Sequence, residues 1–276
     1  IRDDGESRGL GDVYKRQEAI SGHDHHDSTS LDIPVPAFSK ALNKDIKGSK
    51  VGVIKELLAE GVSPDVKNAV ENAIKMYKEL GAEIVEISLP LLEYSIGVYY
   101  ILATAEASSN LARFDGVKYG HRTKDPKNLL EMYTKTRAEG FGDEVKRRIM
   151  LGTYALSAGY YDAYYKKAQQ LRRLIKEDFD RAFEKVDILV SPTCPNTAFE
   201  IGSKIEDPLS MYLTDIGTIS ANLAGIPGMS LPCGYDSDGM PIGLQILAPA
   251  LQEEKLFNMA YNFEQAAKDI QRQPNL

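Results

Sequence analysis

Apolar and polar positions follow a regular order through the first third of the chain. Residues 50–54 form a short apolar run, and residues 82–88 alternate like a half-buried strand. Between them, Ser63 and Pro64 open a segment whose apolar residues recur every three or four positions until Gly81. The pattern predicts strand, helix and strand, with the two strands as parallel neighbours joined by a right-handed crossover.

The remaining pattern predicts further helices and one buried strand. Residues 99–116 favour a helix, and their small side chains would let another element pack closely. Residues 143–183 keep helical spacing over the longest stretch, with a break expected near Gly159. The apolar run at 186–195 is typical of a central parallel strand ended by prolines. A last helix, over 253–268, is expected to cover the sheet of an α/β fold.

The first 17 residues differ from the rest. Residues 1–17 show neither a helical nor a strand period, and their ending resembles translated sequencing-adaptor readthrough. We therefore expect a non-native or disordered tail here and leave it out of the fold. A natural polar tail is the alternative.

Composition narrows the classes of function. The chain has 276 residues, with 33 basic and 40 acidic side chains and a net charge of -7. This balance argues against a broad basic face that grips nucleic acid, so a partner would hold any RNA. Cys194 and Cys233 fit neither a disulfide framework nor a zinc spacing, which favours a reducing cytosol. No apolar run approaches the roughly 18 to 20 residues of a membrane span.

Three groups of reactive side chains have structural interpretations. Three histidines and two aspartates lie within residues 22–30, but no second cluster follows, so we predict a turn in which Asp27 bonds nearby backbone rather than a metal site. Ser108 and Ser109 lie inside a predicted helix, without the sharp turn that a nucleophile needs. No histidine follows Cys194, and we expect this residue to be a small buried thiol.

The C-terminal third carries a recognisable pattern. The run Asn-Leu-Ala-Gly-Ile-Pro-Gly-Met-Ser-Leu-Pro-Cys-Gly-Tyr at 222–235, followed by Pro-Ile-Gly-Leu-Gln-Ile-Leu at 241–247, resembles the C-terminal signature of the amidase-signature family. Residues 99–116 and 139–167 resemble its tRNA-dependent glutaminase branch. The resemblance implies a mixed, largely parallel sheet flanked by helices, with residues 18–276 as the C-terminal portion of one amidase domain.

The same resemblance implies a substrate site without a catalytic centre. The family's catalytic lysine and two serines lie in an upstream segment that this sequence does not match, so no catalytic residue is expected. Tyr99 matches a tyrosine that contacts glutamine, and Tyr100 is the fallback if the register is off by one. Arg148 matches the arginine that binds the α-carboxylate, and Asp215 matches the aspartate that binds the α-ammonium.

The residues alone leave these roles open. Most charge runs on helices, such as residues 146–148, are solvated faces. Three successive residues cover about 300° of a helix, so at least one of the three must turn away from solvent. Asp215 stands among apolar neighbours and is either a solvent-facing helix residue or a buried acid with a purpose.

The implied activity is glutamine hydrolysis within a cytoplasmic complex. Released ammonia would pass to partner subunits B and C, where ATP and magnesium activate glutamate on misacylated tRNA. This chain would bind glutamine, no cofactor and no metal of its own, and would meet tRNA only through the complex, with no membrane involved. A fragment of a free-standing amidase for another acyl amide and a non-catalytic interaction module are the alternatives.

Overall fold

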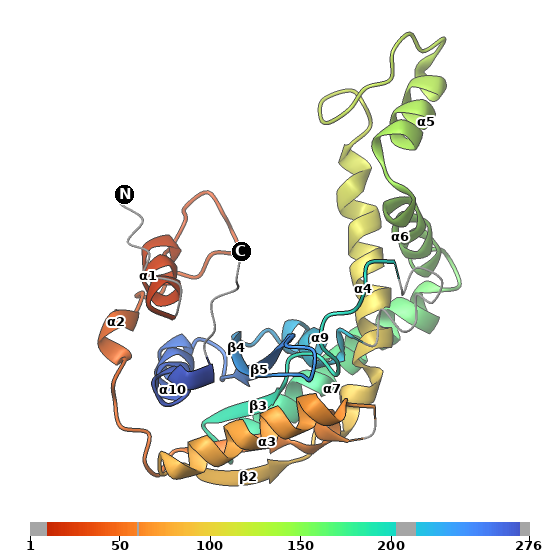
Figure 1. The fold of residues 1–276 in the computed structure, drawn as a ribbon. Helices are drawn as coiled ribbons and strands as arrows, with labels where there is room; N and C mark the ends of the chain where they lie inside the picture. The colour runs from red at the N-terminus through yellow and green to blue at the C-terminus, as the bar shows by residue number, and fades with distance from the viewer. Residues whose placement is uncertain (1–9, 60, 203–213, 271–276) are drawn as a thin grey trace. The chain divides into compact units, whose positions relative to one another are not determined.

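The computed structural model describes residues 10–59, 61–202 and 214–270 (Figure 1). Contacts divide the chain into two compact units. Unit 1 comprises Ile1–Leu92 and Lys176–Leu276, and unit 2 comprises Glu93–Ile175.

Unit 1 is built on a mixed sheet with the strand order β2-β1-β3-β5-β4. β1 is parallel to β2 and to β3, whereas β5 is antiparallel to β3 and to β4. The α/β class, the parallel strand-helix-strand unit and the central, fully buried β3 are confirmed. The strands are β1 (Lys50–Ile54), β2 (Glu83–Ile87), β3 (Ile188–Pro192), β4 (Gly228–Tyr235) and β5 (Pro241–Leu247).

Local signals in the sequence fix both ends of helix α3 in unit 1. The Ser63 hydroxyl accepts a hydrogen bond from the Val66 amide at 3.3 Å, and Pro64 opens α3. Gly81 ends this segment with φ +88°, a conformation that glycine adopts without strain. The helices are α1 (Leu10–Ile20), α2 (Phe38–Ala41), α3 (Pro64–Glu79), α9 (Ile216–Ala224) and α10 (Glu253–Ala266), with short 3₁₀ turns at Lys55–Leu58, Pro90–Tyr94 and Lys268–Ile270.

Helix α1 corrects one expectation. Residues 10–17 belong to it, although the sequence shows no helical period there. Tyr14 packs against the main hydrophobic cluster, which is formed chiefly by buried residues of the strands and of helices α3 and α10, so helix α1 depends on a tertiary contact rather than on a continuous apolar stripe. The expectation of no regular structure is wrong for residues 10–17. Residues 1–9 lie outside the described residues, and the non-native origin of the tail stays a prediction.

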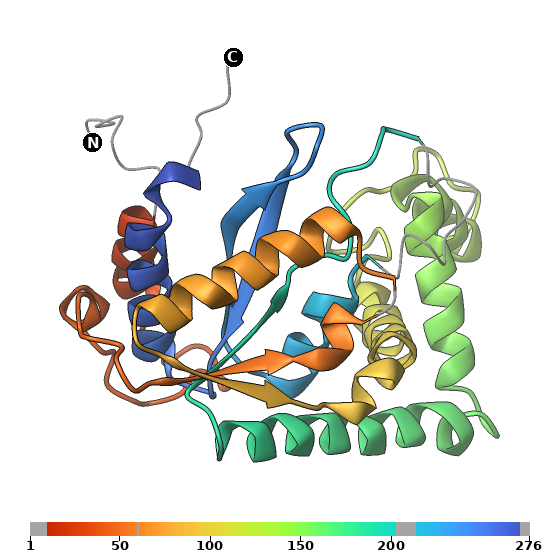
Figure 2. The same cartoon turned by 60° about the horizontal axis from the view of Figure 1, so that its bottom comes forward.

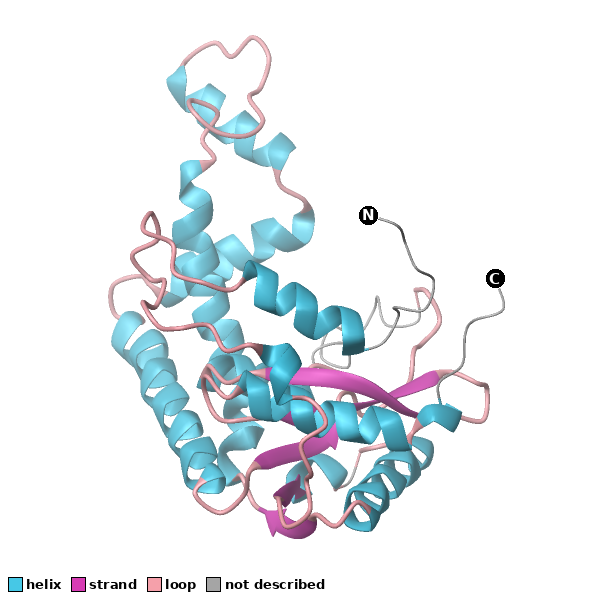
Figure 3. Cartoon of the chain, turned by 90° about the vertical axis from the view of Figure 1, so that its left-hand side faces the viewer, coloured by secondary structure: helices cyan, strands magenta, loops and turns pink. Residues whose placement is uncertain are grey.

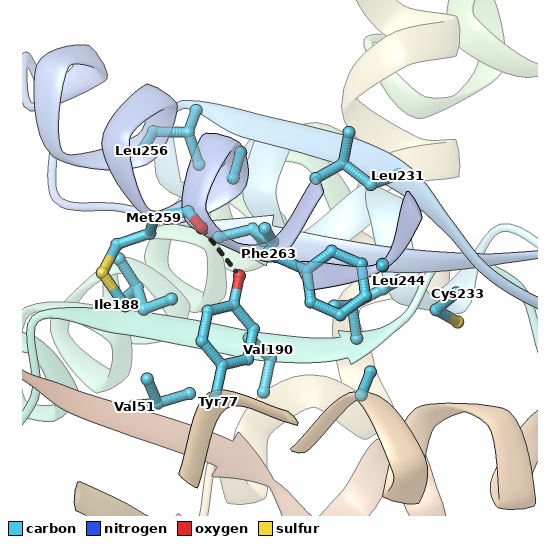
Figure 4. Packing of buried hydrophobic residues seen from close by; sticks show 14 of the residues in the cluster. Val51, Tyr77, Ile188, Val190, Leu231, Cys233, Leu244, Leu256, Met259 and Phe263 are labelled. Carbon is cyan, nitrogen blue, oxygen red and sulfur yellow. Dashed lines mark hydrogen bonds between the residues drawn. The ribbon is translucent and has the colours of Figure 1, made fainter. Parts of the chain in front are cut away.

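A cluster of buried hydrophobic side chains lies between one face of the sheet and helices α3 and α10, whose ribbons Figure 2 shows. Tyr77 of α3 is fully buried in it and stacks on Phe263 of α10, with ring centroids 5.5 Å apart. Its hydroxyl donates to the Met259 carbonyl at 3.2 Å, so the polar end of this buried ring is satisfied (Figure 4). The predicted cover of the sheet by the last helix is confirmed.

Helices also flank the other face of the sheet (Figure 3). Leu189 of β3 and Phe179 of helix α7 (Lys166–Phe183) are buried outside the main hydrophobic cluster. Gly52 belongs to this face, because a Cβ placed on it would lie 2.7 Å from the Leu189 side chain. Ser191 and Gln245 stand opposite each other in the β3–β5 register, and both are buried. This face of the sheet therefore carries two buried polar side chains, Ser191 and Gln245.

Among its described residues, unit 2 consists of helices joined by loops and contains no strand. Its helices α4 (Ser95–Asn110) and α6 (Asp143–Ala155) run side by side (Figure 1). The predicted helix break is confirmed at Gly159, which has φ +87°. The elements are α4 (Ser95–Asn110), a 3₁₀ turn (Leu111–Arg113), α5 (Leu129–Gly140), α6 (Asp143–Ala155), one turn of π-helix (Tyr161–Tyr165) and α7 (Lys166–Phe183), whose last residues belong to unit 1.

A polar network ties the connection between α4 and α5 to α5 itself. The Glu139 carboxylate contacts His121 Nε2 at 2.7 Å and accepts a hydrogen bond from the Thr123 hydroxyl at 2.9 Å. The Thr123 amide donates to the Thr136 hydroxyl at 3.1 Å. These bonds lower the pKa of Glu139, first through His121 and then through Thr123.

Candidate functional site

Arg148 is the most shielded of the three basic residues in its run on α6. The exposed side-chain fractions are 40% for Lys146, 58% for Arg147 and 34% for Arg148. The exposed fractions of Lys146 and Arg148 are close, so they do not single out one side chain as turned away from solvent, and the role of Arg148 as the ligand of a carboxylate stays a prediction.

Arg148 lies among two tyrosines and one carboxylate within unit 2. Its Cζ is 5.6 Å from the ring centroid of Tyr100, and its Nε donates to Glu144 at 2.9 Å. Hydrogen bonding to Glu144 raises the pKa of Arg148, with smaller contributions from Tyr100 and the Tyr99 hydroxyl. The Tyr99 and Tyr100 rings meet edge to face at 5.1 Å. The predicted tyrosine and its fallback are therefore both close to the guanidinium.

Glu144 is a part of this environment that sequence reasoning missed. It lies four residues before Arg148, the spacing at which an acid and a base meet on one helix face. It also binds Arg147. Because Glu144 takes the Nε donor, the N–H groups on the two Nη atoms of Arg148 are the ones suited to a ligand carboxylate.

A close approach between α4 and α6 places Arg148 beside the tyrosines. Gly152, one turn after Arg148, faces the backbone of α4, and a Cβ on it would lie 1.9 Å from the Thr104 carbonyl oxygen. No side chain fits at that distance. The predicted close packing on residues 99–116 is confirmed, and the glycine that permits it belongs to the partner helix.

Asp215, the third predicted site residue, belongs to unit 1 and precedes α9. Its carbonyl accepts the amides of Thr218 and Ile219, each at 3.0 Å, so its backbone is fixed by the first turn of the helix. Its side chain is exposed and makes no hydrogen bond or ion pair with any residue that the structure describes. Asp215 is therefore a solvent-facing residue and not a buried acid. The start of a helix favours a negative charge.

A cavity of about 230 Å³ adjoins the start of α9 in unit 1. It lies where β1 and β3 end, the edge at which open α/β sheets bind ligands. Thr193 on its wall shares a hydrogen bond with Ser230 at 2.7 Å. The lining residues are Glu56, Leu57, Gly61, Val62, Pro192, Thr193, Cys194, Pro195, Ile216 and Gly217.

The two cysteines have opposite environments. Cys194 is exposed, so the expectation of a buried thiol is wrong for this residue. The reason is that β3 ends at Pro192, and Cys194 lies in the following turn rather than in the buried strand. Cys233 on β4 is buried, and burial raises the pKa of its thiol to about 12.

The other reactive side chains have the structural roles predicted for them. The hydroxyls of Ser108 and Ser109 donate to the Ala105 carbonyl of their own helix, at 2.8 and 3.3 Å. Asp27 accepts the amide and hydroxyl of Thr29, which confirms the predicted turn. Among residues 10–59, 61–202 and 214–270, no group of three His, Cys, Asp or Glu side chains is arranged to hold a metal ion. Within the same ranges, no helix combines the length and apolarity of a membrane span.

The sheet with its flanking helices and the signature at residues 222–247 are features of the amidase family. A model of the amidase family matches residues 7–257, and the chain belongs to this family. Solved amidases share the fold. One is a peptide amidase in complex with chymostatin, with a TM-score of 0.73 and 24% identity over 98% of this chain and 54% of that chain.

Relatives with higher sequence identity have a name more specific than amidase, that of an amidotransferase subunit. The chain is 59% identical over 258 residues to the A subunit of glutamyl-tRNA(Gln) amidotransferase from Cyanothece sp., covering 94% of this chain and 54% of that protein. It is 52% identical over 270 residues to the corresponding protein of Oceanobacillus iheyensis, covering 98% and 55%. The crystal structure of the Thermotoga maritima counterpart has a TM-score of 0.72 and 36% identity, covering 93% and 50%. The chain thus spans about half the length of these relatives.

Proposed function

We propose that this chain is the glutamine-binding portion of a glutaminase subunit in a tRNA-dependent amidotransferase. In such a complex, glutamine hydrolysis supplies the ammonia that converts Glu-tRNA(Gln) to Gln-tRNA(Gln). The observation that carries the proposal is identity of 52% to 60% with A subunits of glutamyl-tRNA(Gln) amidotransferase over almost all of this chain.

Two side chains of opposite charge suit the two ends of an amino acid. Arg148 would bind the α-carboxylate of glutamine, because a guanidinium meets a carboxylate through two parallel hydrogen bonds. Asp215 would bind the α-ammonium. The proposal is supported by the shielding of Arg148 beside Tyr99 and by the exposed carboxylate of Asp215, which has no partner among the described residues.

Chemistry and assembly would depend on other segments and subunits. The family's catalytic lysine and two serines have no match in this sequence, so we expect this chain alone not to hydrolyse glutamine. The ammonia would reach partner subunits B and C, and ATP and magnesium would act there. We expect the complex to be cytoplasmic and tRNA to be held by the partners.

The test is ammonia release from glutamine by a chimera that joins residues 18–276 to the N-terminal half of the Cyanothece relative. Removing one partner of a charged hydrogen bond costs about 1.5 to 3 kcal/mol. Arg148→Ala and Asp215→Ala should therefore each lower kcat/KM for glutamine by about 10- to 150-fold. Butanamide, which has neither an α-carboxylate nor an α-ammonium, should be hydrolysed equally by all variants.

Matched controls separate binding from general damage. Arg147→Ala removes the neighbouring, more exposed arginine, and Asp238→Ala removes an exposed aspartate of the β4–β5 turn. Both should behave like the unmodified chimera. An active chimera whose glutamine kinetics ignore both Arg148→Ala and Asp215→Ala would refute the clamp and favour a free-standing amidase for another amide. A folded chimera with no amidase activity would favour an interaction module.

A further inference from the structure

Gln245 is a buried polar residue in an apolar strand. Its neighbours on β5, Leu244 and Ile246, point into the main hydrophobic cluster, so Gln245 points to the opposite face of the sheet. It is only 5% exposed. Burying an amide is costly unless its hydrogen bonds are made, so the partners of Gln245 indicate what it does.

The amide of Gln245 links the sheet to the start of α9. Its Nε2 donates to the Gly217 carbonyl at 2.6 Å and to the Ser191 hydroxyl at 3.3 Å. Ser191 is the cross-strand partner of Gln245 on β3, so the second bond holds the amide in place. The shorter bond reaches the second residue of α9, two positions after Asp215.

Gly217 brings the first turn of α9 against the end of β3. A Cβ on Gly217 would lie 2.7 Å from the Thr193 carbonyl oxygen and 3.0 Å from that of Pro192. The helix can approach this closely only because the residue is glycine. The glycine contact and the Gln245 amide therefore fix the same turn from two sides.

Asp215 follows the position of this turn. Its carbonyl accepts the Thr218 and Ile219 amides, so its backbone moves with the first turn of α9. Its own side chain has no bond to any described residue that would hold it. The location of the carboxylate is therefore determined by the turn that Gln245 anchors.

We propose that Gln245 is a positioning residue for glutamine binding: its amide anchors the first turn of α9 and thereby holds Asp215 where it receives the substrate ammonium. This inference rests on the function proposed above. Gln245 does not touch the substrate, so its loss should act through Asp215. Because Asp215 is proposed to bind the ammonium, its misplacement should weaken glutamine binding by no more than the roughly 10- to 150-fold expected of its removal.

The experiment uses the same chimera with Gln245→Met, which keeps the length of the side chain and removes its donor. KM for glutamine should rise about 10- to 100-fold, with kcat changed less than about threefold. In the Asp215→Ala background, Gln245→Met should add nothing, because the group it positions is gone. With glutaramic acid, which lacks the α-ammonium, Gln245→Met should have no effect. Gln252→Met, on an exposed glutamine, is the matched control.

Several results would overturn the inference. A loss that adds fully to that of Asp215→Ala, or an equal loss with glutaramic acid, would show a merely structural role. An unchanged KM in Gln245→Met, while Asp215→Ala impairs binding, would refute the positioning role and leave the proposed function intact. If Asp215→Ala leaves the glutamine kinetics unchanged, both the positioning role of Gln245 and the proposed role of Asp215 in glutamine binding are refuted.

If the chimera is inactive, amide hydrogen exchange decides the question. Gln245→Met should then speed exchange of the Thr218 and Ile219 amides at least tenfold, while α10 keeps its protection. Unchanged exchange in the first turn of α9 would refute the anchoring role.

Discussion

Gly152→Ala tests whether the contact between α4 and α6 positions Arg148. The new Cβ would lie 1.9 Å from the Thr104 carbonyl oxygen and 2.9 Å from the Ala105 amide nitrogen. Ordinary contact begins near 3.4 Å, so the two backbones must separate by about 1.5 Å. Arg148 lies one turn away on the same helix and would move relative to Tyr99 and Tyr100.

The expected cost can be estimated from two opposing effects. Overpacking a close contact costs up to about 3 kcal/mol, and so short a contact belongs at the upper end. Alanine regains about 1 kcal/mol over glycine inside a helix. In a chimera about twice the length of this chain, the net loss of about 2 kcal/mol should lower Tm by only about 2 °C. A displacement above 1 Å should also lower kcat/KM for glutamine on the order of 100-fold.

Thermal unfolding and glutaminase kinetics of the chimera measure both effects. Gly97→Ala is the matched control, because Gly97 lies on α4 and a Cβ on it would meet nothing within 4 Å. This control should be stabilised by about 1 kcal/mol. If Gly152→Ala were stabilised to the same extent and kept its glutamine kinetics, the helix contact would not position Arg148, and the reasoning would be refuted.

Two further predictions concern titratable groups. Iodoacetamide at pH 8 should modify the exposed Cys194 in the folded chain and leave Cys233 unmodified, since burial raises the pKa of Cys233 to about 12. Digestion and mass spectrometry measure the labelling of each cysteine, and equal labelling of the two would contradict this prediction. Glu139 has a lowered pKa, so its contribution to stability is present above its ordinary value of 4.5 and is lost as pH falls through the lowered value. The Tm difference between the unmodified chimera and Glu139→Gln should therefore shrink on acidification, whereas a constant difference from pH 7 to pH 3 would contradict the role of its bonds to His121 and Thr123.

The sequence determined the local elements because their signals are local. Ser63 and Pro64 start α3, Gly81 ends it, and Gly159 breaks the helical stretch, all within a few residues of the structural boundary. A helix cap or a left-handed glycine depends on neighbouring backbone alone. The resemblance of residues 222–247 to the amidase signature likewise gave the family, which the match over residues 7–257 confirms.

Only the tertiary structure decided which side chains from distant segments share an environment. The place of Gly152 against Thr104, the bond from Gln245 to Gly217 and the exposure of Cys194 depend on how helices and strands pack, and no local period encodes them. Helix α1 shows the same limit, because it forms with one packed tyrosine instead of an apolar stripe. The roles of Tyr99, Arg148 and Asp215 came from resemblance. The structure adds the contacts around each of them, because burial and hydrogen bonding are properties of the packed chain.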